Sequence, residues 1–78
     1  MTKYVVAAVG RGYVFRIAYN LDDICQVRSG CAEEICGSAA NAILEGNDPD
    51  DMLLRIYFKD GNQATFDYYS IDVYTEDD

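Results

Sequence analysis

Hydrophobic and polar positions in the first twenty residues predict a β-hairpin. Residues 3–9 form an almost continuous apolar run, typical of a strand that is central in a sheet or covered on both faces. The segment Gly10-Arg11-Gly12 offers residues that accept positive φ, as a tight turn requires. Residues 13–19 then alternate between two faces and predict the returning strand. The register stays open, because both faces of the first strand are apolar.

A helical period follows between Ser29 and Glu45. Apolar residues recur there at spacings of three and four, with polar residues on the opposite side. Ser29 is suited to cap this helix, and Gly46 and Pro49 are suited to end it. Residues 20–28 carry mixed signals, and we assign them to a connector. The predicted buried stripe consists of Ala32, Ile35, Cys36, Ala39 and Ile43.

Residues 52–69 predict a second hairpin. Positions 52–59 alternate so that the even positions form an apolar face, and residues 63–69 keep that alternation. Beyond them the apolar phase moves from even to odd positions, which predicts a bulge or a short break near Ser70. The polar residues 75–78 are expected to fray.

The side chains that meet across this hairpin predict its register. A two-residue loop would mix core with surface positions, whereas a three-residue loop, Asp60-Gly61-Asn62, sets apolar residues opposite one another. In that register Ile56 faces Phe66, and Asn62 takes the left-handed conformation. On the outer face, Arg55 is expected to lie opposite Asp67.

The order of these elements predicts an α+β fold, a four-stranded antiparallel sheet in ββαββ order with one helix packed on one face. A chain of 78 residues allows one domain, 1–78, with a small core. Seven Tyr and three Phe are too many large side chains for a disordered acidic chain. We expect a cytoplasmic protein, because no apolar run approaches a membrane-spanning length and no secretion signal is recognisable.

Residues that carry chemistry are sparse. Cys25, Cys31 and Cys36, without any histidine, have the wrong number and spacing for a zinc site, and an odd count favours free thiols. The segment 10–12 lacks the glycine spacing and the following helix of a nucleotide-binding loop. We therefore predict no catalytic site, no metal and no cofactor. A thiol enzyme or redox sensor is the remaining chemical alternative.

Charge is segregated along the chain. The segment Glu45–Asp78 carries ten acidic and two basic residues, a net charge of -8, whereas residues 1–44 carry four of each sign. Such acidity disfavours direct binding to nucleic acid or anionic membranes and favours encounter with basic surfaces. Carboxylates on alternate residues of one strand face stand about 6.8 Å apart, so a row of them can imitate a phosphate path. The alternative is a solvated surface that keeps a small protein soluble.

The predicted contact set for a basic partner combines the carboxylates of this segment with its tyrosines, which are favoured interface residues. Asp67 is left out because Arg55 is expected to neutralise it. The set comprises Asp48, Asp50, Asp51, Asp60, Asp72, Glu76, Asp77, Tyr57, Tyr69 and Tyr74.

As a whole, this profile resembles the small acidic inhibitors encoded by phages, above all the anti-CRISPR class. The resemblance lies in the Tyr-rich strands of 3–19, the single helix of 29–45 and the acidic residues from Asp48 onward. It implies an inhibitor that presents a DNA-mimicking surface to a CRISPR effector or nuclease, as a monomer or homodimer. Toxin-immunity proteins share the profile. They imply an immunity or adaptor protein that binds a basic toxin or enzyme through aromatic contacts, with the acidic face only steering association.

Overall fold

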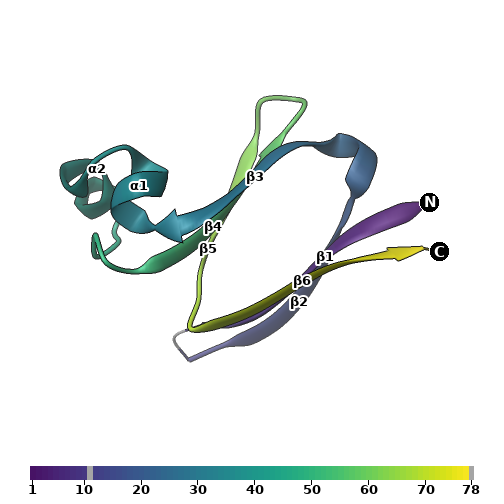
Figure 1. The fold of residues 1–78 in the computed structure, drawn as a ribbon, viewed down its shortest axis with the longest axis horizontal. Helices are drawn as coiled ribbons and strands as arrows, with labels where there is room; N and C mark the ends of the chain where they lie inside the picture. Colours follow the sequence, from purple (N-terminus) through teal and green to yellow (C-terminus); the bar gives the residue numbers. More distant parts are fainter. Residues whose placement is uncertain (11, 78) are drawn as a thin grey trace.

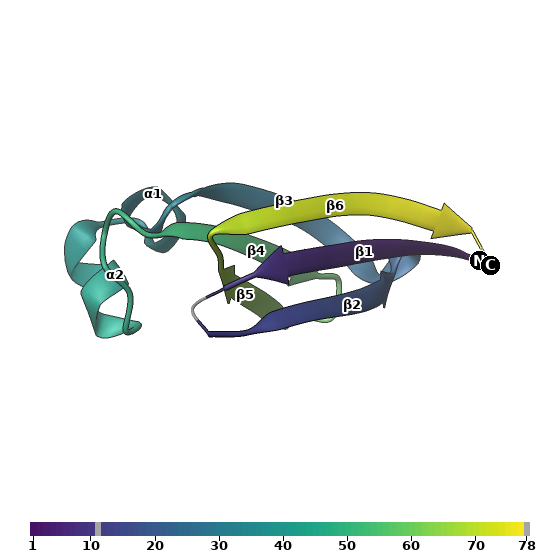
Figure 2. The same ribbon diagram turned by 90° about the horizontal axis from the view of Figure 1, so that it is seen from below.

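Six strands in two three-stranded antiparallel sheets make up most of the computed structural model, which describes residues 1–10 and 12–77. In what we call the terminal sheet, the order is β2 (Val14–Asn20), β1 (Thr2–Val9) and β6 (Ser70–Asp77). In the middle sheet, the order is β3 (Ile24–Cys31), β4 (Met52–Phe58) and β5 (Gln63–Asp67). The 3₁₀ turn η1 (Leu21–Asp23) joins the two sheets. The helices α1 (Ala32–Cys36) and α2 (Ala39–Leu44) lie at the end opposite the termini (Figures 1 and 2).

The predicted fold, one four-stranded ββαββ sheet with a single helix, is therefore wrong. Two strands were missed. β3 arises from the presumed connector and the presumed first turn of the helix, and it pairs with β4. β6 arises from the residues beyond the expected break, of which only the last, 75–78, were expected to fray. It pairs with β1 along its whole length, from Thr2 opposite Asp77 to Val9 opposite Ser70. Pairing satisfies the backbone groups of both segments, which outweighs their polar side chains.

The first hairpin is confirmed, with Val9 opposite Val14. Its first strand, β1, is central in the terminal sheet, as the apolar run predicted, and Val5 and Val6 are fully buried on its two faces. Arg11 of the predicted turn lies outside the described residues.

The second hairpin is confirmed, but its register differs from the prediction by two residues. The loop has three residues, 59–61, because the Phe58 N–H donates to the Asn62 carbonyl at 2.9 Å. Gly61 takes the left-handed conformation, with φ of 91°, that was assigned to Asn62. Ile56 consequently faces Ala64 rather than Phe66. A shift of two keeps every side chain on its predicted face.

The predicted single helix is broken into two. Gly37, with φ of 93°, ends α1, and the Ser38 hydroxyl caps α2 by accepting a hydrogen bond from the Asn41 N–H at 3.1 Å. The break turns α2 about its axis. Ala42 is therefore buried, whereas Ile43 of the predicted stripe is 63% exposed.

The predicted start of the helix is wrong, and its predicted end is confirmed. Ser29 is not a cap, because it lies within β3, opposite Leu54. Gly46 does end the helical region: its φ is 89°, and the Asn47 N–H reaches back to the Ala42 carbonyl at 2.9 Å. The short break expected near Ser70 is also confirmed. There the chain crosses between sheets, since Tyr68 bonds to Met52 and Tyr69 bonds to Val9.

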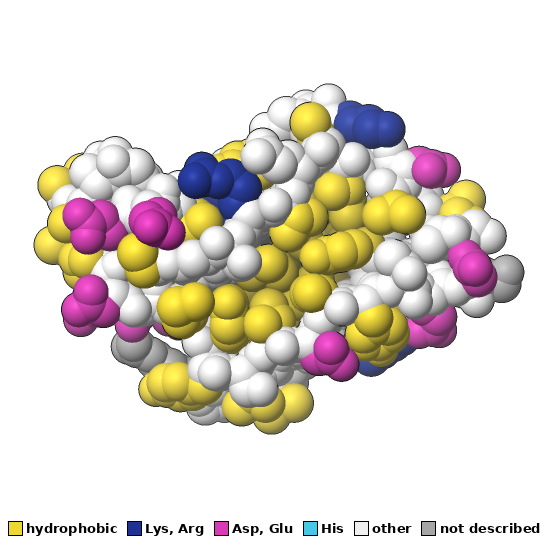
Figure 3. Space-filling model, viewed as in Figure 1, with side chains coloured by type: hydrophobic (Ala, Val, Ile, Leu, Met, Phe, Trp, Pro, Cys, Tyr) yellow, Lys and Arg dark blue, Asp and Glu magenta, His cyan; other side chains and the backbone are white. Residues whose placement is uncertain are grey.

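Aromatic rings close one side of the core between the sheets. Phe15 on β2 stacks on Phe66 of β5, with ring centroids 5.1 Å apart, and Tyr19 lies 5.2 Å from Phe58. The opposite side, between the edge strands β3 and β6, is less covered, and hydrophobic side chains are visible there in Figure 3. Val73 of β6 is 41% exposed, although its register partner Val6 is fully buried.

Candidate partner-binding surface

The loop after α2 is fastened to the start of α1. The Ala32 N–H donates to the Asp51 carbonyl at 2.7 Å, and the Glu33 N–H donates to the Pro49 carbonyl at 3.1 Å. These bonds satisfy amide groups that a helix start leaves without internal partners. They also bring the carboxylates of the loop next to those of the first helical turn. We call this group the acidic cap; it comprises Glu33, Glu34, Asp48, Asp50 and Asp51.

The loop of the acidic cap is held by its own side chains. The Asp51 carboxylate accepts from the Asp48 N–H, and the Asp48 carboxylate accepts from the Asp50 N–H, each at 3.1 Å. Pro49 between them fixes one φ angle. The negative charges are thus presented by an ordered turn.

Four of the five carboxylates of the acidic cap are open to a partner. Glu33, Glu34, Asp48 and Asp50 are exposed, and none of them lies in an ion pair with a described residue. Acidic side chains gather over the helical end of the molecule in Figure 3. Exposed carboxylates on neighbouring segments raise the local negative potential, which attracts a basic surface.

Arg55 anchors the helices to β4. Its guanidinium donates to the Glu45 carboxylate at 2.7 Å and to the Thr65 hydroxyl at 2.9 Å, and it is only 6% exposed. Its predicted place on an outer face, opposite Asp67, is wrong. The register sets Thr65 opposite Arg55, and the helices cover this face of β4, where Leu53 packs on Ala32, Ile35 and Ala42.

The thiol next to this anchor is not activated. Burial and the neighbouring Glu45 carboxylate raise the pKa of the Cys36 thiol, whereas a reactive cysteine needs a lowered pKa. Hydrogen bonding with Cys36 and the charge of Arg55 lower the pKa of Glu45, although burial acts in the opposite direction. All three cysteines are free thiols.

The carboxylates at the end of β6 take part in the terminal sheet. Arg16 on β2 reaches across β1 to Glu76, with an ion pair of 2.7 Å, and to the Tyr74 hydroxyl at 3.1 Å. The Asp77 carboxylate accepts from the Thr2 hydroxyl at 2.6 Å. Asp72 is exposed on the same face as Glu76, two register positions before Tyr74.

The predicted contact set is not brought together in one place. Its members are distributed over the acidic cap, the β4–β5 loop with Asp60, and β6, along a molecule whose longest dimension is 40 Å. Of the tyrosines, Tyr69 is 71% exposed where the chain crosses between sheets, while Tyr57 is partly buried on β4. Glu33 and Glu34 of the acidic cap were not in the predicted contact set. The helix start could have indicated them, because its amide groups need hydrogen-bond acceptors, which the loop supplies here.

No family model, no curated protein and no solved structure matches this chain. In residues 1–10 and 12–77, no group of three or more His, Cys, Asp or Glu side chains is placed to hold a metal ion. None of the helices in that part of the chain is long and apolar enough to span a membrane.

Proposed function

We propose that this chain is a small acidic inhibitor that binds a basic nucleic-acid-binding protein, such as a CRISPR effector or a nuclease, and blocks its access to DNA. The acidic cap is the surface that makes the contact. The observation that supports it is the docking of the loop on α1, with amide-to-carbonyl distances of 2.7 and 3.1 Å. This docking adds Glu33 and Glu34 to the loop carboxylates.

The acidic cap suits this role better than the carboxylates of β6. A phosphate mimic must keep its negative charge available, and Glu76 is already neutralised by Arg16. The loop of the acidic cap is already ordered in the free protein by hydrogen bonds. Binding a partner therefore costs little further conformational entropy in this loop. No catalytic step is needed, since occupying the DNA-binding surface is sufficient to inhibit.

The test is competition with DNA in a panel of CRISPR effectors and nucleases. Binding of the chain is expected to exclude DNA and to weaken steeply between low and high salt. The double variant Glu33→Gln/Asp50→Asn should lose about tenfold in affinity, the scale of one to two kcal/mol for charges at an interface. Its charge-matched control is Asp22→Asn/Asp72→Asn, which should bind as the wild type does.

Affinity that does not change with salt, or equal losses in both double variants, would contradict the proposed role of the acidic cap. Folding of each variant is checked by its amide NMR spectrum. A variant with wild-type dispersion but reduced inhibition isolates binding from stability.

A second function is favoured by the uncovered side of the core. Among the described residues, each of the edge strands β3 and β6 has one backbone edge without a strand partner, and hydrophobic side chains are exposed between the two strands (Figure 3). Val73 of β6 is 41% exposed. Such an edge suits an immunity or adaptor protein that binds through apolar contacts, with charge only steering association. In that case Glu33→Gln/Asp50→Asn would slow association yet leave the equilibrium affinity intact, and Val73→Asp would abolish binding.

A further inference from the structure

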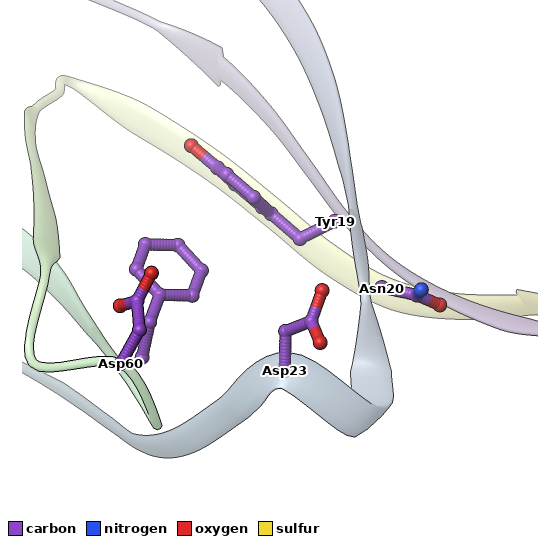
Figure 4. A pocket seen from close by; sticks show the side chains of 5 residues that line it. Tyr19, Asn20, Asp23 and Asp60 are labelled. Atoms are coloured by element: carbon purple, nitrogen blue, oxygen red, sulfur yellow. The ribbon is translucent and has the colours of Figure 1, made fainter.

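A pocket of about 250 Å³ lies where η1 meets the β4–β5 loop, away from the acidic cap. It is lined by Tyr19, Asn20, Asp23, Phe58 and Asp60 (Figure 4). This pocket was not predicted, because Asn20 and Asp23 belong to a segment that was assigned to a connector.

The walls of this pocket are fixed before anything binds. The Lys59 N–H donates to the Asp23 carbonyl at 2.9 Å, which joins η1 to the end of β4. On the loop, the Asn62 backbone and side-chain amides donate to the two carboxylate oxygens of Asp60, at 2.9 and 3.0 Å. These bonds orient the Asp60 carboxylate without neutralising its charge.

Among the described residues, the buried pocket atom without a hydrogen-bond partner is Oδ1 of Asn20, whereas Asp23 is exposed. Its carboxylate makes no hydrogen bond or ion pair with a described residue, and it points toward the space beside the Tyr19 ring (Figure 4). The amide of Asn20 points away from that space in the same view, so the two carboxylates are the charged groups that face a ligand. Neither Asp23 nor Asp60 has a cationic partner among residues 1–10 and 12–77.

The remaining walls are aromatic. The rings of Tyr19 and Phe58 lie 5.2 Å apart and are inclined by 49°, so they form an angled apolar surface next to the carboxylates. The face of an aromatic ring attracts cations, and aliphatic groups also pack on it. Two carboxylates alone do not complete the six to eight oxygen ligands that a Ca²⁺ ion takes.

We propose that this pocket binds an organic cation, an ammonium or guanidinium group on a short apolar stem. The charged group would contact Asp23 and Asp60, and the stem would lie on Tyr19 and Phe58. The volume is just below the range of about 300–1,000 Å³ that is typical of sites for drug-sized ligands, so a single side chain or a small amine fits it best. The cation belongs either to a lysine or arginine of a protein or to a free amine. This inference does not depend on the proposed function.

The experiment is an NMR titration of the whole chain with three probes: N-acetyl-lysine methylamide, butylamine and the neutral butanol. The two cations are expected to give saturable shifts confined to Tyr19, Asp23, Phe58 and Asp60. Asp23→Asn should weaken their binding by about tenfold, the scale of one charge-assisted hydrogen bond. Asp22→Asn removes the same charge from the neighbouring residue of η1, which does not line the pocket, and should leave binding nearly unchanged.

The source of the cation is distinguished by the first two probes. Tighter binding of the lysine derivative indicates a protein side chain, and tighter binding of butylamine indicates a free amine. Butanol binding as tightly as butylamine, shifts that do not saturate, or equal losses in Asp23→Asn and Asp22→Asn would overturn the proposal. The Asp23 side chain makes no hydrogen bond with a described residue, so Asp23→Asn should fold as the wild type does. Unchanged amide NMR signals from β3 and β4 would verify this.

Discussion

The acidic cap and the end of β6 are built from the same residue types, yet their charges are used differently. On β6, Glu76 is paired with Arg16, and Asp77 is hydrogen-bonded to Thr2, so these carboxylates help to hold three strands together. In the acidic cap, backbone bonds hold the structure, and the exposed carboxylates of Glu33 and Asp50 have no cation partner among the described residues. The formal charge of a sequence segment therefore does not equal the charge that is exposed and available to a binding partner.

The largest expected effect comes from the anchor beneath the acidic cap. Arg55→Ala should lower the free energy of unfolding by about 2–3 kcal/mol, because the buried guanidinium and its partly buried hydrogen bonds to Glu45 and Thr65 are lost together. Urea denaturation measures this loss. The matched control is Arg28→Ala, the exposed register partner on β3, which should change stability by about 0.5 kcal/mol or less. Equal losses in the two variants would show that Arg55 does not anchor the helices.

The junction between the helices should give the next largest effect. Gly37 has φ of 93°, and a Cβ added there would meet only the Asn41 amide at 3.7 Å, so the cost of Gly37→Ala is conformational rather than steric. We expect a loss of about 1–2 kcal/mol. The measurement is urea denaturation together with amide hydrogen exchange, which should rise in α1 and the loop of the acidic cap while β6 stays protected. Uniform loss of protection would mean that the two regions are not independent.

Low pH should weaken the anchor by a smaller amount. The pKa of Glu45 in the folded chain is lowered, by hydrogen bonding with Cys36 and by Arg55, so its contribution to stability is complete above its unfolded pKa, about 4.3. That contribution is lost as the pH falls through the lower folded pKa. Wild type should therefore lose more stability than Glu45→Gln between pH 5 and pH 3, on the scale of titrating one side chain. Parallel urea midpoints for both proteins would contradict the lowered pKa.

The smallest effect concerns the exposed carboxylates themselves. Glu76→Gln should lower the melting temperature slightly at low salt and not at high salt, because it breaks a screened surface ion pair with Arg16. Asp50→Asn should leave the melting temperature unchanged or raise it, since it relieves repulsion in the acidic cap. A loss in Asp50→Asn as large as that in Glu76→Gln would remove the contrast between the regions.

Local patterns predicted local structure well and sheet assembly poorly. Alternation found both hairpins and the apolar face of β4, because each depends on neighbours a few residues apart. The pairing of β6 with β1 joins the two ends of the chain, and no short-range pattern carries that information. The break between the helices did have a local signal, which was overlooked. Gly37 is suited to end a helix, and Ser38 directly after it is suited to begin one.

The candidate site could be predicted only in part, because it also depends on contacts between segments that are distant in the sequence. The acidity of residues 48–51 was evident from the sequence, but the contribution of Glu33 and Glu34 depends on a loop that docks on α1. The position of Arg55 was missed because a charged residue at an odd position of β4 was assigned to the surface. Two helices cover that face, and Glu45 supplies the counter-charge.

The most direct test of the central claim compares the two acidic regions against one basic probe. A titration of the labelled chain with an oligolysine peptide at low salt, followed by amide NMR, reports both regions at once. Shifts around Glu33 and residues 48–51 should be several times those along β6 and should disappear at high salt. Shifts that are largest along β6, or equal in the two regions, would contradict the central claim.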